Sequence, residues 1–200
     1  MNFLAHLLLS GEDPELLVGN FIADHVKGNA KYLYPERIRL GIELHRKIDH
    51  FTDTHPITTE SKALIYPTQK KYAPVVVDLY YDHFLAANFN QFSSKQLPDF
   101  TSFCYTILSN HYDMLPAEIQ SFLPFMIERN WLSNYATVDG IGRSLKGLSR
   151  RVNFENQMHL ADEDLLRHYP NLERHFHSFF PELINFVESF HHETLPQNKA

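Results

Sequence analysis

The chain has 200 residues, of which 44% are hydrophobic and 14% aromatic, and its formal net charge at pH 7 is −6. This length and composition support one domain with a substantial core and exclude an intrinsically disordered protein. The negative charge balance does not support general nucleic-acid binding, so we expect no nucleic-acid partner.

The cysteine content and the N-terminal segment bear on the compartment. Cys104 is the single cysteine, which excludes an internal disulfide and a cysteine-based zinc site and suits a reducing environment. The apolar run FLAHLLL is too short to span a bilayer, is interrupted by His6 and lacks the basic region of a signal peptide. We therefore expect a cytoplasmic protein with no membrane partner.

Prolines mark the starts of predicted helices in the first part of the chain. Residues 13–15, Asp-Pro-Glu, supply the N-cap and first turn of a helix that continues through residue 22. Residues 29–34 connect it to a second helix, which opens at Pro35 and breaks over residues 52–56, because proline cannot extend a helix.

The same pattern continues along the chain and predicts an all-α fold. Continuing apolar residues favour a buried helix over a strand at residues 74–89. We find no repeat, low-complexity run or linker, so residues 1–200 are predicted to form one all-α domain, a helical bundle. The remaining predicted segments are 57–66, 100–115, 116–129 with an interruption at Pro124, 140–151, 162–190 with breaks at Pro170 and Pro181, and a frayed tail at 196–200.

The stretch GIELHRKIDHFTDTH, residues 41–55, carries the most concentrated set of potential ligands. On a helix, His45 and Asp49 lie about 40° apart on one face, and Asp53 would follow on that side if the helix continued. An imidazole and a carboxylate one turn apart suit a divalent metal ion. The alternative is a solvated helix face on which these acids pair with Lys or Arg.

Three other stretches place charge where the helical pattern expects apolar residues. His6 could instead be a core histidine that donates a hydrogen bond to a backbone carbonyl. Asp24 lies near the C-terminal end of a helix, where the negative end of the helix dipole is unfavourable for a carboxylate. Asp78 and Asp82 share a face among Val, Leu, Tyr and Phe, where an unpaired carboxylate is costly to bury. Together the four stretches indicate a carboxylate-and-imidazole metal site inside a bundle, suited to Mn²⁺, Mg²⁺, Fe²⁺ or Zn²⁺ and to hydrolysis.

At these residues the sequence resembles the acyl carrier protein phosphodiesterase (acyl carrier protein hydrolyase) family, a divergent relative of HD-domain phosphohydrolases. The matching segments are MNFLAHL, GNFIADHVKG, GIELHRKIDHFTDTHP, YAPVVVDLYYDHFLA, the W-L-x-x-Y run at 131–135, GIGRSL at 140–145 and the aromatic helix around 176–180. The combination of HRKIDHFTD with YYDHFLA is more specific than either piece alone.

The resemblance implies an HD-domain-like all-α fold, a role in lipid metabolism and fatty acid biosynthesis, and Mn²⁺. It implies hydrolysis of holo-acyl carrier protein to apo-acyl carrier protein and 4′-phosphopantetheine. The adjacent His-Asp signature of HD enzymes is here separated as HRKID, which leaves the ligand set and the number of ions open. By position, the resemblance implies metal-site candidates Asp24, His45, Asp49 and Asp82, with His6, Asp78 and His83 next in line.

Further roles are predicted for side chains outside the ligand set. His83 or His50 could protonate the departing serine oxygen. Arg46 could bind a phosphoryl oxygen, or alternatively form a surface ion pair with Glu43 or Asp49.

A basic helical face with few acids nearby in the sequence is predicted to bind the acidic carrier protein. The alternative is a solvated face with no partner. Its residues are Arg143, Lys146, Arg150 and Arg151. Two rival functions stay open, namely an HD-type hydrolase of small phosphoesters or nucleotides and a helical module that binds metal without turnover.

Overall fold

The computed structural model describes residues 2–194, and the regular secondary structure of this part of the chain is helical, without a strand. The structure therefore confirms the all-α, single-domain prediction, whereas the likeness to HD domains stays a prediction. The predicted frayed tail at residues 196–200 lies outside the described residues. Among residues 2–194, no helix combines the length and apolar character that a membrane span requires.

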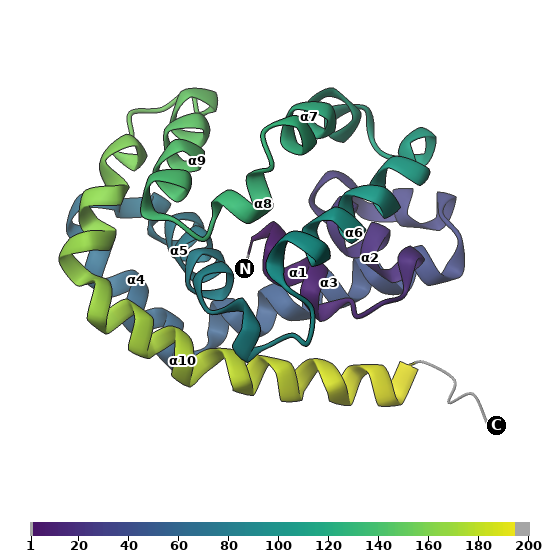
Figure 1. The fold of residues 1–200 in the computed structure, drawn as a ribbon, viewed down its shortest axis with the longest axis horizontal. Helices are drawn as coiled ribbons and strands as arrows, with labels where there is room; N and C mark the ends of the chain where they lie inside the picture. Colours follow the sequence, from purple (N-terminus) through teal and green to yellow (C-terminus); the bar gives the residue numbers. More distant parts are fainter. Residues whose placement is uncertain (1, 195–200) are drawn as a thin grey trace.

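Residues 2–194 form ten α-helices, and short 3₁₀ turns lie in several of the connections between them (Figure 1). The α-helices are α1 (Phe3–Leu9), α2 (Pro14–Ile22), α3 (Glu36–Thr54), α4 (Pro56–Gln69), α5 (Ala73–Ala87), α6 (Leu97–Asn110), α7 (Ala117–Glu128), α8 (Trp131–Asn134), α9 (Val138–Arg151) and α10 (Ala161–Thr194). The 3₁₀ turns are η1 (Ala23–His25), η2 (Gly28–Leu33), η3 (Lys70–Tyr72), η4 (Phe89–Gln91), η5 (Tyr112–Met114) and η6 (Met158–Leu160).

Helices α2 and α3 cross with their backbones in direct contact. A Cβ atom on Gly19 would lie 2.0 Å from the Ile38 carbonyl oxygen, and one on Gly41 would lie 2.3 Å from the Leu16 carbonyl oxygen. Because real Cβ atoms cannot approach so closely, only glycine permits this crossing at both positions. The close approach brings the residue after Gly19, Asn20, against α3.

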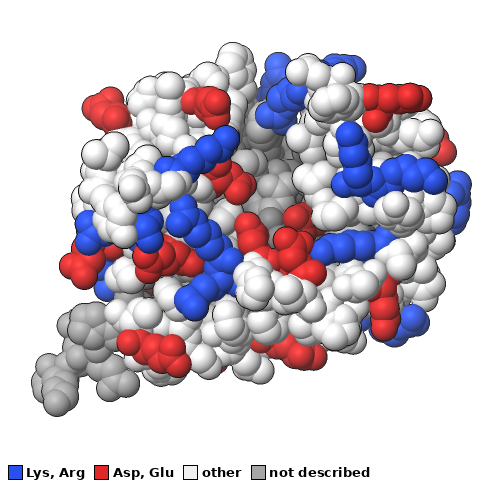
Figure 2. Space-filling model, turned by 180° about the vertical axis from the view of Figure 1, so that it is seen from behind, with Lys and Arg blue, Asp and Glu red and all other residues white. Residues whose placement is uncertain are grey.

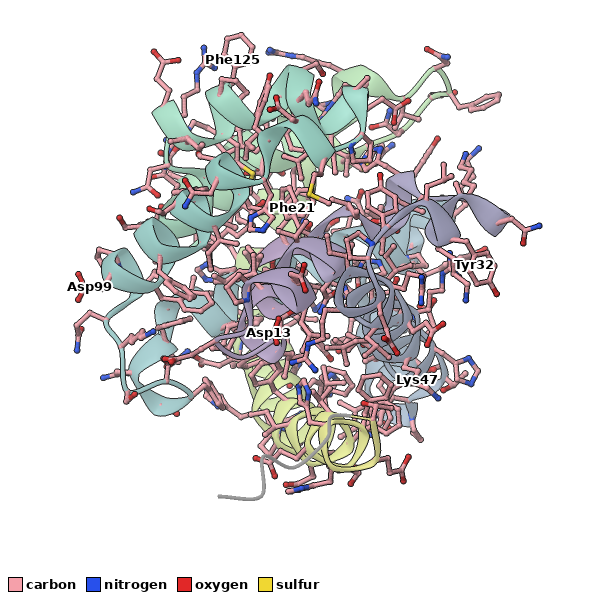
Figure 3. The ribbon with its side chains drawn as sticks, turned by 90° about the vertical axis from the view of Figure 1, so that its right-hand side faces the viewer. Asp13, Phe21, Tyr32, Lys47, Asp99 and Phe125 are labelled. Carbon is pink, nitrogen blue, oxygen red and sulfur yellow. The ribbon has the colours of Figure 1, made fainter. Side chains whose placement is uncertain are left out.

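The core is built from apolar and aromatic side chains of these helices. Figure 3 shows Phe21 inside the molecule, whereas Lys47 lies on the outer surface of α3. Phe21 is 2% exposed, and its ring packs 5.1 Å from the ring of Phe3, centroid to centroid. This packing fixes α2 against α1, and therefore fixes Asn20 relative to His6 of α1.

Three predicted proline breaks are wrong. Pro124 lies inside α7, and Pro170 and Pro181 lie inside α10, which continues over 34 residues. All three prolines are exposed, so the helix can bend around each ring on the solvent side while its other face stays buried. Figure 1 shows α10 curving around the molecule past α9, α4 and α5. Its buried side chains, which include Phe176, Phe179 and Phe180, keep it attached to the core.

Candidate functional site

His6 from α1 and His45 and Asp49 from α3 form one cluster. The Nε2 atom of His6 lies 3.1 Å from Asp49 Oδ1, and the Nε2 atom of His45 lies 3.0 Å from Asp49 Oδ2. The two imidazole rings stack with their centroids 4.0 Å apart. Potential ligand atoms from all three side chains lie within 4.8 Å of one another. The structure thus brings together three predicted metal-site residues from two helices, and His6 precedes the other two by about 40 residues in the chain.

Asn20 orients both imidazole rings through hydrogen bonds to their Nδ1 atoms. Its Oδ1 atom accepts from Nδ1 of His6 at 2.8 Å, and its backbone oxygen accepts from Nδ1 of His45 at 2.8 Å. Its amide group donates to the His6 carbonyl oxygen and to Ser10 Oγ, both at 2.9 Å. Since both Nδ1 atoms face oxygen acceptors, each carries its proton there, and each Nε2 is directed toward Asp49.

The cluster has the electrostatics of a cation site. Burial and the neighbouring His45 lower the pKa of His6 to about 4. Burial opposes protonation of His45, but the Asp24 and Asp49 carboxylates outweigh it and raise the pKa of His45 to about 9. Burial also opposes ionisation of Asp49, but the hydrogen bond from His45 and the adjacent His6 ring lower its pKa well below the ordinary range.

A neutral His6 therefore directs the lone pair of Nε2 at a carboxylate oxygen of Asp49 only 3.1 Å away. Two acceptors at this separation repel each other unless a cation or a proton lies between them. The cluster thus fits a divalent ion by its donor types and by the orientation of its ring nitrogens.

Asp24, on η1, approaches the cluster from the solvent side. Its Oδ1 atom lies 3.2 Å from His45 Nε2, and its side chain is 71% exposed. The hydrogen bond from His45 lowers the pKa of Asp24, so its carboxylate is ionised near neutral pH. This placement makes Asp24 a possible additional ligand, whereas Asp53 points elsewhere and pairs with Lys62 Nζ at 2.9 Å.

Asp82, one of the two carboxylates that the sequence places among apolar residues, contacts the start of α1. Its Oδ2 atom accepts from the Leu4 amide at 2.8 Å, and its Oδ1 atom accepts from the Ala5 amide at 3.2 Å. These amides belong to the first turn of a helix, which has no internal acceptors for them. Asp82 therefore anchors the helix that carries His6. Asp78, one turn earlier on α5, is half-buried, and burial raises its pKa.

The predicted proton donors and the phosphate-binding arginine occupy different surroundings. His83 is buried, with Nδ1 donating to the Tyr135 carbonyl oxygen at 2.8 Å and Nε2 lying 3.1 Å from the Tyr169 hydroxyl. His50 is exposed and follows Asp49 directly in the chain. Arg46 is also exposed, and its Nη2 atom donates to the Val26 carbonyl oxygen at 3.1 Å.

Neither alternative ion pair of Arg46 forms within residues 2–194. Glu43 instead pairs with Lys31 at 2.9 Å, and the Asp49 carboxylate faces the two histidines of the cluster. The Arg46 side chain instead contacts the Val26 carbonyl oxygen, two residues after Asp24 in the chain.

The predicted partner-binding face on α9 is less basic than its sequence indicates. Arg143 forms an ion pair with Asp139 one turn earlier, and Lys146 Nζ lies 3.1 Å from Asp162 Oδ2. The sequence pattern could not show that the start of α10 packs against α9 and brings Asp162 to this face. Arg150 and Arg151 are exposed.

One face of the molecule is hollowed at its centre (Figure 2). Asp and Glu side chains gather at the edge of this hollow, and Lys and Arg side chains lie on both sides of it. The net charge of −6 is therefore unevenly distributed, and local positive regions remain available to an acidic partner.

Sequence reasoning missed Asn20. The signal was present, because Asn20 is the one polar side chain in the apolar helix PELLVGNFI after its first turn. It is completely buried, and a buried amide requires partners.

Comparisons with known proteins identify a family and relatives that align over nearly the whole chain. A family model described as acyl carrier protein phosphodiesterase matches residues 1–183. A protein named acyl carrier protein phosphodiesterase from Photorhabdus laumondii is 32% identical and aligns over 98% of this chain and 100% of its own length. Proteins of the same name from Yersinia pestis and Escherichia coli are each 33% identical over 92% of this chain and 96% of their own lengths.

No solved structure is significantly similar to the chain. The family match spans the segments that supply His6, Asn20, Asp24, His45 and Asp49, and it is supported by relatives aligned over nearly their whole lengths. The chain belongs to the acyl carrier protein phosphodiesterase family.

Proposed function

We propose that this protein is a metal-dependent phosphodiesterase that acts on holo-acyl carrier protein. It would hydrolyse the phosphodiester between 4′-phosphopantetheine and serine, releasing 4′-phosphopantetheine and apo-acyl carrier protein. The observation that carries the metal-dependent chemistry is the pair of imidazoles whose Nδ1 atoms donate to Asn20 and whose Nε2 atoms face Asp49. The substrate class rests on the family membership.

The ion would be held by His6 Nε2, His45 Nε2 and the Asp49 carboxylate, with Asp24 able to add a fourth oxygen. Two nitrogens with one or two carboxylates suit Mn²⁺, Fe²⁺ or Zn²⁺ and also admit Mg²⁺. Of these we propose Mn²⁺, the ion that the resemblance to the family implies. When bound, the ion would supply Lewis-acid activation of water and neutralisation of phosphoryl charge.

The side chains of this protein would contribute positioning and proton transfer. Asn20 keeps the Nδ1 protons in place, so that both rings present the same nitrogen to the ion. Arg46, which is exposed and donates to the Val26 carbonyl oxygen near Asp24 in the chain, would bind a phosphoryl oxygen through its planar guanidinium.

His50 is the better candidate for protonating the departing serine oxygen, because its side chain is exposed and accessible to a substrate. His83 is less suited, since both of its ring nitrogens already have partners in a buried position.

Product analysis would test the substrate. The metal-supplied protein is incubated with holo-acyl carrier protein and, separately, with a panel of nucleotides and small phosphoesters, and the products are identified by mass spectrometry. We expect loss of the phosphopantetheine group from the carrier protein and slow or undetectable cleavage of the panel. Faster turnover of a nucleotide would favour the HD-type hydrolase of small substrates. A protein that binds the ion and cleaves nothing would be a binding module.

A further inference from the structure

A second surface beside the cluster combines exposed apolar side chains with positive charge. We define the η2 surface by Lys27, Tyr32, Leu33, Arg46 and Lys47. Leu33 is 86% exposed and Tyr32 is 63% exposed, and the three basic residues are exposed as well. Large apolar side chains this exposed beside one another often mark a binding surface.

The charge of this region opposes that of the whole protein. Residues 27–47 contain six Lys or Arg residues and two Asp or Glu residues, a net charge of +4 in a chain of net charge −6. Lys27, Arg46 and Lys47 form no ion pair within residues 2–194. An acidic partner would therefore be attracted to this region and repelled by much of the remaining surface.

The η2 surface is preformed, because three contacts attach its turns to α3. Lys31 Nζ pairs with Glu43 at 2.9 Å, Arg39 Nη1 donates to the Tyr34 carbonyl oxygen at 3.3 Å, and Arg46 Nη2 donates to the Val26 carbonyl oxygen at 3.1 Å. A surface that is already ordered loses little conformational entropy when a partner binds.

The η2 surface is also continuous with the cluster. Asp24 on η1 contacts His45, and Arg46 donates to the carbonyl oxygen of Val26, which lies between Asp24 and Lys27 in the chain. A partner bound here would place its nearest exposed side chains at the open, Asp24 side of the cluster.

We propose that the η2 surface docks the acidic carrier protein, with Tyr32 and Leu33 packing on an apolar side chain of an acidic helix and Lys27 and Lys47 facing its carboxylates. The proposal rests on the proposed function for the identity of this partner. The α9 face is the weaker alternative, because Arg143 and Lys146 are already paired with Asp139 and Asp162.

Binding measurements with three double variants would test this assignment. Metal-free protein is passed over immobilised holo-acyl carrier protein at low and at high salt, and dissociation constants are compared. Lys27→Glu/Lys47→Glu should weaken binding about tenfold or more at low salt and much less at high salt, because surface charges are screened. Tyr32→Ser/Leu33→Ser should weaken binding about tenfold at both salt concentrations, because it removes apolar contact.

The matched control on α9 is Arg150→Glu/Arg151→Glu, which also reverses two exposed positive charges and should change binding less than about threefold. Circular dichroism and Mn²⁺ affinity are recorded for all variants as measures of folding. A larger loss from the α9 variant than from the η2 variants would overturn the proposal and move docking to α9. Unchanged carrier-protein binding by the η2 variants, with lost binding to vesicles containing phosphatidylglycerol, would also overturn it in favour of a membrane-binding surface.

The same experiment separates this proposal from the proposed function. Carrier protein that binds through the η2 surface but is not cleaved by the metal-supplied enzyme would refute the activity and support the docking surface. Cleavage with no dependence on the η2 residues would support the activity and refute the docking surface.

Discussion

Asp49→Ala is expected to reduce turnover of holo-acyl carrier protein by about a thousandfold or more. Both imidazoles direct Nε2 at this carboxylate, so its loss removes the oxygen ligand and leaves two nitrogens to hold the ion. A bound ion stabilises transition-state charge by several kcal/mol, and about 4 kcal/mol corresponds to a factor of about a thousand in rate. Initial rates followed by mass spectrometry, together with Mn²⁺ affinity by calorimetry, measure the effect.

Asp82→Ala is the matched comparison, because it removes a second carboxylate that the sequence also marks as a ligand candidate. Asp82 accepts from two amides at the start of α1, and leaving buried donors without acceptors costs about 2–4 kcal/mol of unfolding free energy. Asp82→Asn keeps one oxygen acceptor and should lose less. Denaturant unfolding measures these differences.

Asp49→Ala and Asp82→Ala are therefore expected to differ in their effects on stability and on Mn²⁺ binding. Asp49→Ala should keep its stability and lose Mn²⁺ binding, whereas Asp82→Ala should lose stability. Full activity in Asp49→Ala would contradict the proposed ligand set. An Asp82→Ala protein of unchanged stability that no longer binds Mn²⁺ would make Asp82 a ligand.

Asn20→Ala is expected to weaken Mn²⁺ binding about 10- to 100-fold, the usual effect of losing a partner that orients metal-binding histidines. The substitution removes the Oδ1 acceptor of His6 Nδ1 and the amide that bonds the His6 carbonyl oxygen. The His6 ring then becomes free to rotate or to move its proton to Nε2. Calorimetric titration with Mn²⁺ measures the change.

Ser10→Ala is the control for Asn20, because Ser10 Oγ accepts from the same amide group and itself donates to the His6 carbonyl oxygen rather than to a ring nitrogen. It should change Mn²⁺ affinity much less than Asn20→Ala. Equal effects of the two substitutions would show that the network stabilises the fold without orienting the histidines.

The helix periodicity was sufficient to predict half of the site. His45 and Asp49 lie one turn apart, and spacing alone predicts that their side chains meet on one face. The joining of His6 and Asn20 to them could not be predicted in this way, because it depends on the packing of α1 on α2 and on the crossing of α2 and α3. That crossing requires glycine at positions 19 and 41 on different helices, which is a tertiary contact with no local signature.

Other differences between the predictions from sequence and the structure also come from tertiary contacts. The anomaly of a carboxylate in VVVDLYYDHFLA was visible in the sequence, but its partners are amides of α1, 77 and 78 residues away in the chain. The prolines of α10 suggested breaks, but a buried aromatic face holds the helix together across them. In both cases packing against distant segments outweighs the local preference.

The most direct test of the account is the rate of 4′-phosphopantetheine release from holo-acyl carrier protein by metal-free protein titrated with Mn²⁺. The cluster of His6, His45 and Asp49 predicts negligible turnover without the ion. It also predicts a saturable rise in rate whose midpoint agrees with the Mn²⁺ affinity measured by calorimetry. Undiminished turnover by protein from which metal has been removed would contradict the account.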